Sequence, residues 1–264
     1  MPFATARDGA RLAYEVTGAG PPLLLVAGQA QDRGLWAGAR DDFAARHRVI
    51  VFDHRGTGES DKPEQPPYST RGFAGDAIAV LDAVGVARAH VYGVSMGGRI
   101  GQWLAIDHAA RIGGLVLGCT TPGNAHGVRR PAAVDPVLAS GDPRQLRPYL
   151  VSPAWIAANM AFLVAAEAHT RSQPVPAYAR RLHYQASEQH DAWALLPAIT
   201  APTLVIHGSE DQVNLPENAT LLAQRIPGAE LHIIPGGRHS YYWEYRPAAS
   251  DRVLEFLARH PLDR

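Results

Sequence analysis

The sequence has only one cysteine, Cys119, in 264 residues. No disulfide can therefore form within the chain, and the spacings typical of Cys/His metal fingers are absent. Charge of one sign is not in excess either, because 25 Lys plus Arg residues balance 25 Asp plus Glu residues. A net charge of zero gives no electrostatic reason to expect a nucleic acid or an anionic membrane as a partner.

Long hydrophobic runs are also missing. No apolar stretch approaches the roughly 20 residues of a transmembrane helix. The N-terminal residues MPFATARDGARLAYE lack the basic region followed by an apolar core that marks a signal peptide. We therefore expect a cytoplasmic protein, and the length fits one large α/β domain or two small ones.

Short apolar segments alternate with amphipathic ones along most of the chain. Most of the apolar segments are continuous, as in strands buried on both faces of a parallel sheet. The expected strands are 11–18, 21–28, 47–53, 89–94, 112–118, 202–208 and 229–235. Helical periodicity follows at 72–86, 218–226 and 249–260. This alternation predicts an α/β fold, with a mostly parallel central sheet flanked by helices.

Residues 122–198 interrupt the alternation. They are rich in Pro, Ala and Arg, and they have helical stretches at 153–169 and 176–190 but no strong strand pattern. An insertion of this length is usually functional. We expect 122–198 to form a helical cap, or lid, over the carboxyl edge of the sheet, and 1–121 with 199–264 to form the core.

The stretch VYGVSMGGRIGQ, residues 91–102, places Ser95 between an apolar strand and the start of a helix. Serine and glycine at such a junction could simply form a turn with a helix N-cap. The alternative is a nucleophile elbow, in which a strained strand-to-helix turn exposes the serine hydroxyl and small neighbours allow the close approach. Gly93 and Gly97 meet that requirement, so Ser95 is the candidate nucleophile.

A serine nucleophile needs a base and an acid that orients the base. His239 lies on the glycine-rich loop after the last expected strand, and Asp211 follows the strand before it, with Glu210 as the main competitor. The order Ser95, Asp211, His239 is the nucleophile–acid–base order of a strand–turn–helix hydrolase. Taken alone, His239 could equally be an ordinary surface histidine, and Asp211 and Glu210 could be solvated loop acids.

An oxyanion site would complete this set of groups. One backbone N–H should come from Met96, the residue after the nucleophile. The second should come from the loop VAGQAQD, where we assign it to Gln29. Because both donors are backbone groups, the side chains there need not be polar.

These segments together resemble the α/β-hydrolase family over almost the whole chain outside the cap. The matching motifs are GVSMGG (93–98), FDHRGTGES (52–60), GSED (208–211) and GGRH (236–239). Within the family, FDHRGTGES together with SMGGRIGQWLA (95–105) is most similar to 3-oxoadipate enol-lactonase-like serine esterases. Two positions depart from the family pattern. Ala27 stands where a histidine is common, and Arg238 replaces a common glycine, either facing solvent or contacting an anionic substrate.

The resemblance implies a serine hydrolase that cleaves a carboxylic ester or lactone of a small molecule, with no metal or organic cofactor. A serine at position 95 excludes the dehalogenases and epoxide hydrolases of this fold, which need an aspartate there. Hydrolysis of a carbon–carbon bond in a diketone, a lyase or cyclase reaction, and a ligand receptor that retains the triad remain alternatives. Trp155 and Tyr241 are the candidate substrate-binding side chains, and the oligomeric state is open.

Overall fold

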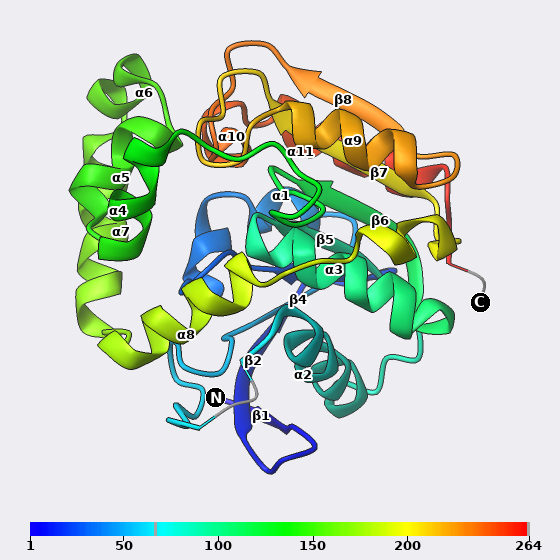
Figure 1. Ribbon diagram of the computed structural model, residues 1–264. Helices are drawn as coiled ribbons and strands as arrows, with labels where there is room; N and C mark the ends of the chain where they lie inside the picture. Colours follow the sequence, from blue (N-terminus) through cyan, green and yellow to red (C-terminus); the bar gives the residue numbers. More distant parts are fainter. Residues whose placement is uncertain (66–67, 263–264) are drawn as a thin grey trace.

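An eight-stranded sheet forms the centre of the computed structural model, which describes residues 1–65 and 68–262 (Figure 1). Its spatial order is β1-β2-β4-β3-β5-β6-β7-β8. The strands are β1 (Phe3–Thr5), β2 (Arg11–Thr17), β3 (Pro22–Val26), β4 (Arg48–Phe52), β5 (Ala89–Val94), β6 (Ile112–Gly118), β7 (Thr203–Gly208) and β8 (Glu230–Ile234). Strands β1 and β2 pair antiparallel, as do β2 and β4, and the pairs from β4 to β8 are parallel. The α/β fold predicted from the sequence is confirmed, and the one strand that the pattern missed is the three-residue β1.

Helices cover both faces of the sheet. Along β3, Leu24 and Val26 enter the apolar cluster beneath α2, α3 and α9, whereas Leu23 and Leu25 enter the cluster beneath α1 and α11. These helices are α1 (Arg40–Ala44), α2 (Thr70–Ala83), α3 (Met96–Asp107), α9 (Glu217–Arg225) and α11 (Ala248–Ala258). Such alternation buries both faces of the parallel strands and brings their carboxyl ends to one edge. Within the described ranges, no helix combines the length and apolar character needed to cross a bilayer.

The chain between β6 and β7 consists of helices joined by loops, with one isolated β-bridge between Gly123 and Asp191. Its α-helices stand together at one side of the core (Figure 1). They are α4 (Asp135–Ser140), α5 (Pro143–Leu150), α6 (Pro153–Ala158), α7 (Met160–Ser172) and α8 (Ala177–Glu188). The helix expected at 153–169 is broken at Asn159, whose backbone leaves the helical region and whose side-chain amide donates to the Trp155 carbonyl at 2.9 Å.

Three of the buried histidines are His54, His183 and His190. Burial lowers the pKa of His54 to about 4 and that of His183 to about 3, and it holds the pKa of His190 well below its usual range. In the unfolded chain a histidine titrates near pH 6.5. Below that pH the unfolded chain takes up protons that the folded protein does not, so the free energy of unfolding must fall as the pH is lowered from 6.5 toward 4.

Between pH 6.5 and pH 4, each of these histidines should lower the free energy of unfolding by about 1.4 kcal/mol for each pH unit. We therefore expect the free energy of unfolding to drop by about 4 kcal/mol between pH 7.5 and pH 5.5 from these three groups. Urea titrations at pH 7.5 and pH 5.5 measure this difference in the free energy of unfolding. A His190→Phe variant should lose about a third of the difference, and equal stabilities of the native protein at both pH values would contradict the account.

Candidate functional site

Ser95 occupies the junction between β5 and α3. Its backbone is at φ 56° and ψ −119°, in the left-handed half of conformational space that a residue with a Cβ rarely adopts. Packing enforces the strained turn, because a Cβ on Gly93 would lie 2.1 Å from the Gly97 carbonyl oxygen and one on Gly97 would lie 2.2 Å from the Val26 carbonyl oxygen. The glycines thus let helix α3 start directly against β3 and β5, with the half-buried Ser95 at the carboxyl edge of the sheet.

The loops after β7 and β8 bring an acid and a histidine together. The Nδ1 atom of His239 lies 2.8 Å from Oδ2 of Asp211, and both side chains are buried. The carboxylate can only accept, so Nδ1 carries a proton, and Nε2 is the ring nitrogen left to exchange a proton with a reacting group. Glu210 differs, because its side chain is 57% exposed and faces Arg238 at 3.7 Å.

Further donors surround Asp211. Its Oδ1 accepts the backbone N–H groups of Val213 and Asn214 at 2.8 and 3.0 Å, and its Oδ2 lies 3.1 Å from Nε2 of His207. Burial alone would raise the pKa of the Asp211 carboxyl, but His239 and His207 outweigh burial and hold that pKa well below its usual range. The site therefore contains a fixed negative charge against the imidazole of His239. His207 and Asn214 were not singled out from the sequence.

The loop after β3 lies beside Ser95. A Cβ built on Gly28 would lie 3.5 Å from the Ser95 Cβ, so the backbone passes next to the serine. Gln29 follows in a turn that the Gln31 N–H closes on the Gly28 carbonyl at 3.3 Å. Met96 is the first residue of α3, where backbone N–H groups have no acceptor within the helix. The two N–H groups that the sequence indicated thus belong to segments that both adjoin Ser95.

This arrangement and the sequence that forms it are shared with known proteins. A model of the alpha/beta hydrolase fold matches residues 21–245. The chain belongs to the α/β-hydrolase family. The resemblance seen in its motifs is thereby confirmed.

Individual relatives of this α/β hydrolase are named for several acyl substrates. RutD of Azorhizobium caulinodans, named as a candidate carbamate hydrolase, is 36% identical over 91% of this chain and 92% of its own. The enol-lactonase of Burkholderia xenovorans superposes with a TM-score of 0.85 at 27% identity, covering 97% of this chain and 100% of that one. Est816, an N-acyl homoserine lactone degrading enzyme, has a TM-score of 0.81 at 32% identity, with 96% and 99% covered.

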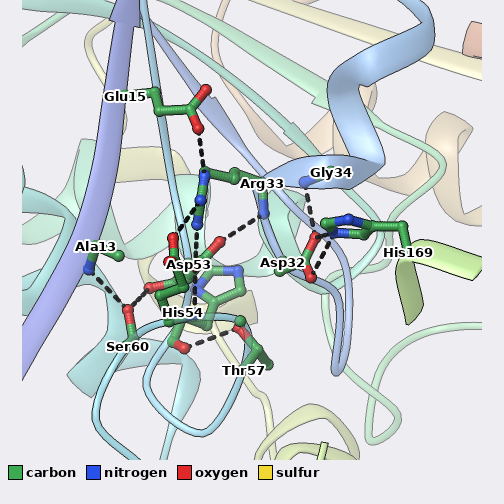
Figure 2. Close-up of polar contacts among 12 residues, drawn as sticks. Ala13, Glu15, Asp32, Arg33, Gly34, Asp53, His54, Thr57, Ser60 and His169 are labelled. Carbon is green, nitrogen blue, oxygen red and sulfur yellow. Dashed lines mark hydrogen bonds and ion pairs between the residues drawn. The ribbon is translucent and has the colours of Figure 1, made fainter. Parts of the chain in front are cut away.

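The turn after β4 carries a dense set of polar contacts in this hydrolase (Figure 2). The buried Asp53 carboxylate accepts the backbone N–H groups of Arg33 and Glu59 at 2.9 and 2.8 Å and forms an ion pair with the Arg33 guanidinium. Next to it, His54 donates from Nε2 to the Ala27 carbonyl at 3.0 Å. The histidine common at position 27 is replaced by Ala27, and His54 holds the same loop from the neighbouring strand end.

The 122–198 segment contacts the loop that carries His239. The backbone N–H groups of His239 and Ser240 donate to the carbonyls of Tyr149 and Leu150 at 3.4 and 2.8 Å. Arg238 donates from Nη1 to the Pro148 carbonyl at 2.7 Å, at the C-terminal end of α5. A cation is favourable at that end of a helix. The sequence left open whether Arg238 faces solvent or contacts an anionic substrate. In the structure its guanidinium instead links α5 to the loop of His239.

Trp155 and Tyr241 differ in their environments. Trp155, on α6, is half-buried and begins an aromatic row in which its ring contacts Phe162 at 5.8 Å and Phe162 contacts Trp243 at 5.3 Å. Tyr241 is fully buried, and its hydroxyl pairs with that of Tyr92 at 2.9 Å. The structure thus places Tyr241 in the core beneath the site, where its side chain is not accessible to a substrate.

Proposed function

We propose that the protein is a serine hydrolase that cleaves a carboxylic ester or lactone of a small molecule through an acyl-enzyme. The observation that carries the proposal is the buried Asp211–His239 pair at 2.8 Å, on the loops after β7 and β8. Ser95 stands in its strained turn after β5, at the same edge of the sheet. The names of the relatives, an enol-lactonase and a homoserine lactone degrading enzyme, agree with this substrate class.

In this mechanism Ser95 Oγ attacks the acyl carbon while Nε2 of His239 takes the hydroxyl proton. Asp211 keeps the imidazole in the required tautomer and stabilises the imidazolium that forms. The N–H groups of Gln29 and Met96 donate to the developing oxyanion. His239 then returns the proton to the leaving oxygen. Water, activated by the same histidine, releases the acid and restores Ser95.

A carbamate is the second candidate substrate. The observation that favours it is the 36% identity with the candidate carbamate hydrolase RutD over 91% of the chain. A carbamate passes through the same kind of tetrahedral intermediate, so Ser95, His239 and the oxyanion donors would keep their roles. The two substrates differ in the group next to the acyl carbon, which is carbon in an ester and nitrogen in a carbamate.

A substrate panel tests the proposal. It contains p-nitrophenyl esters of graded acyl length, γ-lactones with and without an acylamino side chain, p-nitrophenyl carbamates and a vinylogous diketone. We expect the highest kcat/KM on an ester or lactone, and loss of that activity in Ser95→Ala. A carbamate turned over faster than every ester and lactone would select the second candidate. Turnover of the diketone alone would replace both by carbon–carbon bond hydrolysis.

We also propose that the cap, 122–198, supplies the acyl-side pocket, with Trp155 as its aromatic contributor. Trp155 lies three residues after Ser152, whose backbone N–H donates to the Glu244 carboxylate at 3.0 Å just beyond the loop of His239.

Trp155→Ala should change the ratio of kcat/KM for short and long acyl esters by about tenfold, mainly through KM. Trp193→Ala is the matched control, because Trp193 is half-buried too but stacks on His126 near α9. Equal ratios in the two variants would contradict the proposal.

A further inference from the structure

Three successive peptide groups in the loop 27–31 are each held by a hydrogen bond. The first is the Ala27 carbonyl, which accepts from Nε2 of His54 at 3.0 Å. The second is the Gly28 carbonyl, which accepts from the Gln31 N–H at 3.3 Å. A trans peptide directs its N–H away from its carbonyl. Fixing the Gly28 carbonyl therefore fixes the direction in which the Gln29 N–H points.

The third bond comes from the cap. The Ala30 N–H donates to Nδ1 of His183 on α8, at 3.2 Å. Ala30 is at φ 54°, in the left-handed region that a residue with a Cβ rarely adopts. A strained residue of this kind persists only when its surroundings hold it. The hydrogen bond to His183 holds this residue from outside the loop.

The imidazole of His183 is fixed in one tautomer. Its Nε2 lies 2.8 Å from the Arg55 carbonyl, which can only accept, so Nε2 carries the proton. The Ala30 N–H can only donate, so Nδ1 must be unprotonated. The ring is fully buried and packs on Phe73 at 5.0 Å and Tyr68 at 5.6 Å. Only a neutral, immobile imidazole makes both bonds.

We propose that His183 is a positioning residue of the oxyanion hole: through Ala30 it sets the peptide groups on either side of Gln29 and so aims the Gln29 N–H at the substrate oxygen. The inference rests on the oxyanion role given to Gln29 in the proposed function. It makes the cap part of the catalytic geometry, because α8 has to be docked for the hole to be formed. Loss of this bond lets the left-handed turn at Ala30 relax and turns the donor away.

The test replaces His183 by residues that keep or lose the acceptor. His183→Phe and His183→Leu retain apolar packing but lose Nδ1, whereas His183→Asn places an amide oxygen near the Nδ1 position. His190→Phe is the matched control, since His190 is also a buried histidine just after α8 but contacts Thr70 and Gln102 instead of the loop. Thermal unfolding shows which variants are folded, and the Leu variant serves if the Phe variant is not.

Removing one oxyanion donor outright costs about 10²–10³ in kcat, so a misdirected donor should cost at least about tenfold. We expect that loss in His183→Phe and His183→Leu, with KM within about threefold. Affinity for an aryl trifluoromethyl ketone, whose serine adduct carries an oxyanion, should fall by the same factor. His183→Asn should recover most of the kcat and most of the affinity for the ketone. His190→Phe should change the stability and neither of these two quantities.

Wild-type kcat in the folded Phe or Leu variant would overturn the inference. So would a kcat loss without loss of ketone affinity, or an equal loss in His190→Phe, because those results describe a purely structural role. Failure of the proposed function gives a different result, namely turnover that survives Ser95→Ala whatever stands at position 183.

Discussion

Ester turnover should fall by about 10⁶-fold in Ser95→Ala, with the fold retained. The hydroxyl forms the bond to the acyl carbon, and its loss leaves only the binding and oxyanion groups to act on water. The site tolerates alanine, because the left-handed backbone is imposed by the close approach at Gly93 and Gly97 and not by the hydroxyl. Steady-state kinetics on the best substrate of the panel, with a thermal unfolding midpoint for each protein, measure the effect.

Ser69→Ala is the control for this substitution. Ser69 is exposed, and its hydroxyl caps α2 by accepting the Gly72 N–H at 2.9 Å. Its loss should cost about 1 kcal/mol of stability and leave kcat unchanged. If Ser95→Ala kept more than a hundredth of the native kcat, another group would have to be the nucleophile.

Asp211→Asn should lower kcat by about 10⁴-fold. The neutral amide no longer stabilises the imidazolium, and its NH₂ group competes with the Nδ1–H of His239, which favours the wrong tautomer. Because the carboxylate also accepts from Val213, Asn214 and His207, the variant should be less stable as well. Comparing kcat with the unfolding midpoint separates the two effects.

Glu210→Gln is the matched control for the acid. It changes the adjacent residue by the same chemistry, at a side chain that is 57% exposed and 3.7 Å from Arg238. We expect kcat within about twofold, as for most exposed ion pairs. A larger loss in Glu210→Gln than in Asp211→Asn would reverse the assignment of the acid.

Much of the fold could be predicted because its strands are buried on both faces. Continuous apolar runs such as the one that became β6, Ile112–Gly118, give an unambiguous pattern. Strand β1 was not predicted, because three residues with one buried side chain are too few to show a periodic pattern. The break at Asn159 escaped because the helical pattern continues across it, while the backbone there is decided by local hydrogen bonding.

The candidate site was predictable where function follows from position along the chain. Ser95, Asp211 and His239 each follow a strand, so their order along the chain and their positions after the strands predict the roles of nucleophile, acid and base. His54 and His183 act on a loop distant in the sequence, and nothing around either one marks it. Tyr241 was expected to line the substrate pocket because it is a large aromatic side chain, but it is fully buried and its hydroxyl pairs with that of Tyr92.

Mapping the adduct of a fluorophosphonate shows whether Ser95 is the nucleophile. The protein is treated with the probe and digested, and the modified residue is identified by tandem mass spectrometry. We expect one adduct, on Ser95 in the sequence VYGVSMGGR, which is absent after heat denaturation and in Ser95→Ala. An adduct on any other residue, or undiminished labelling of Ser95→Ala, would contradict it.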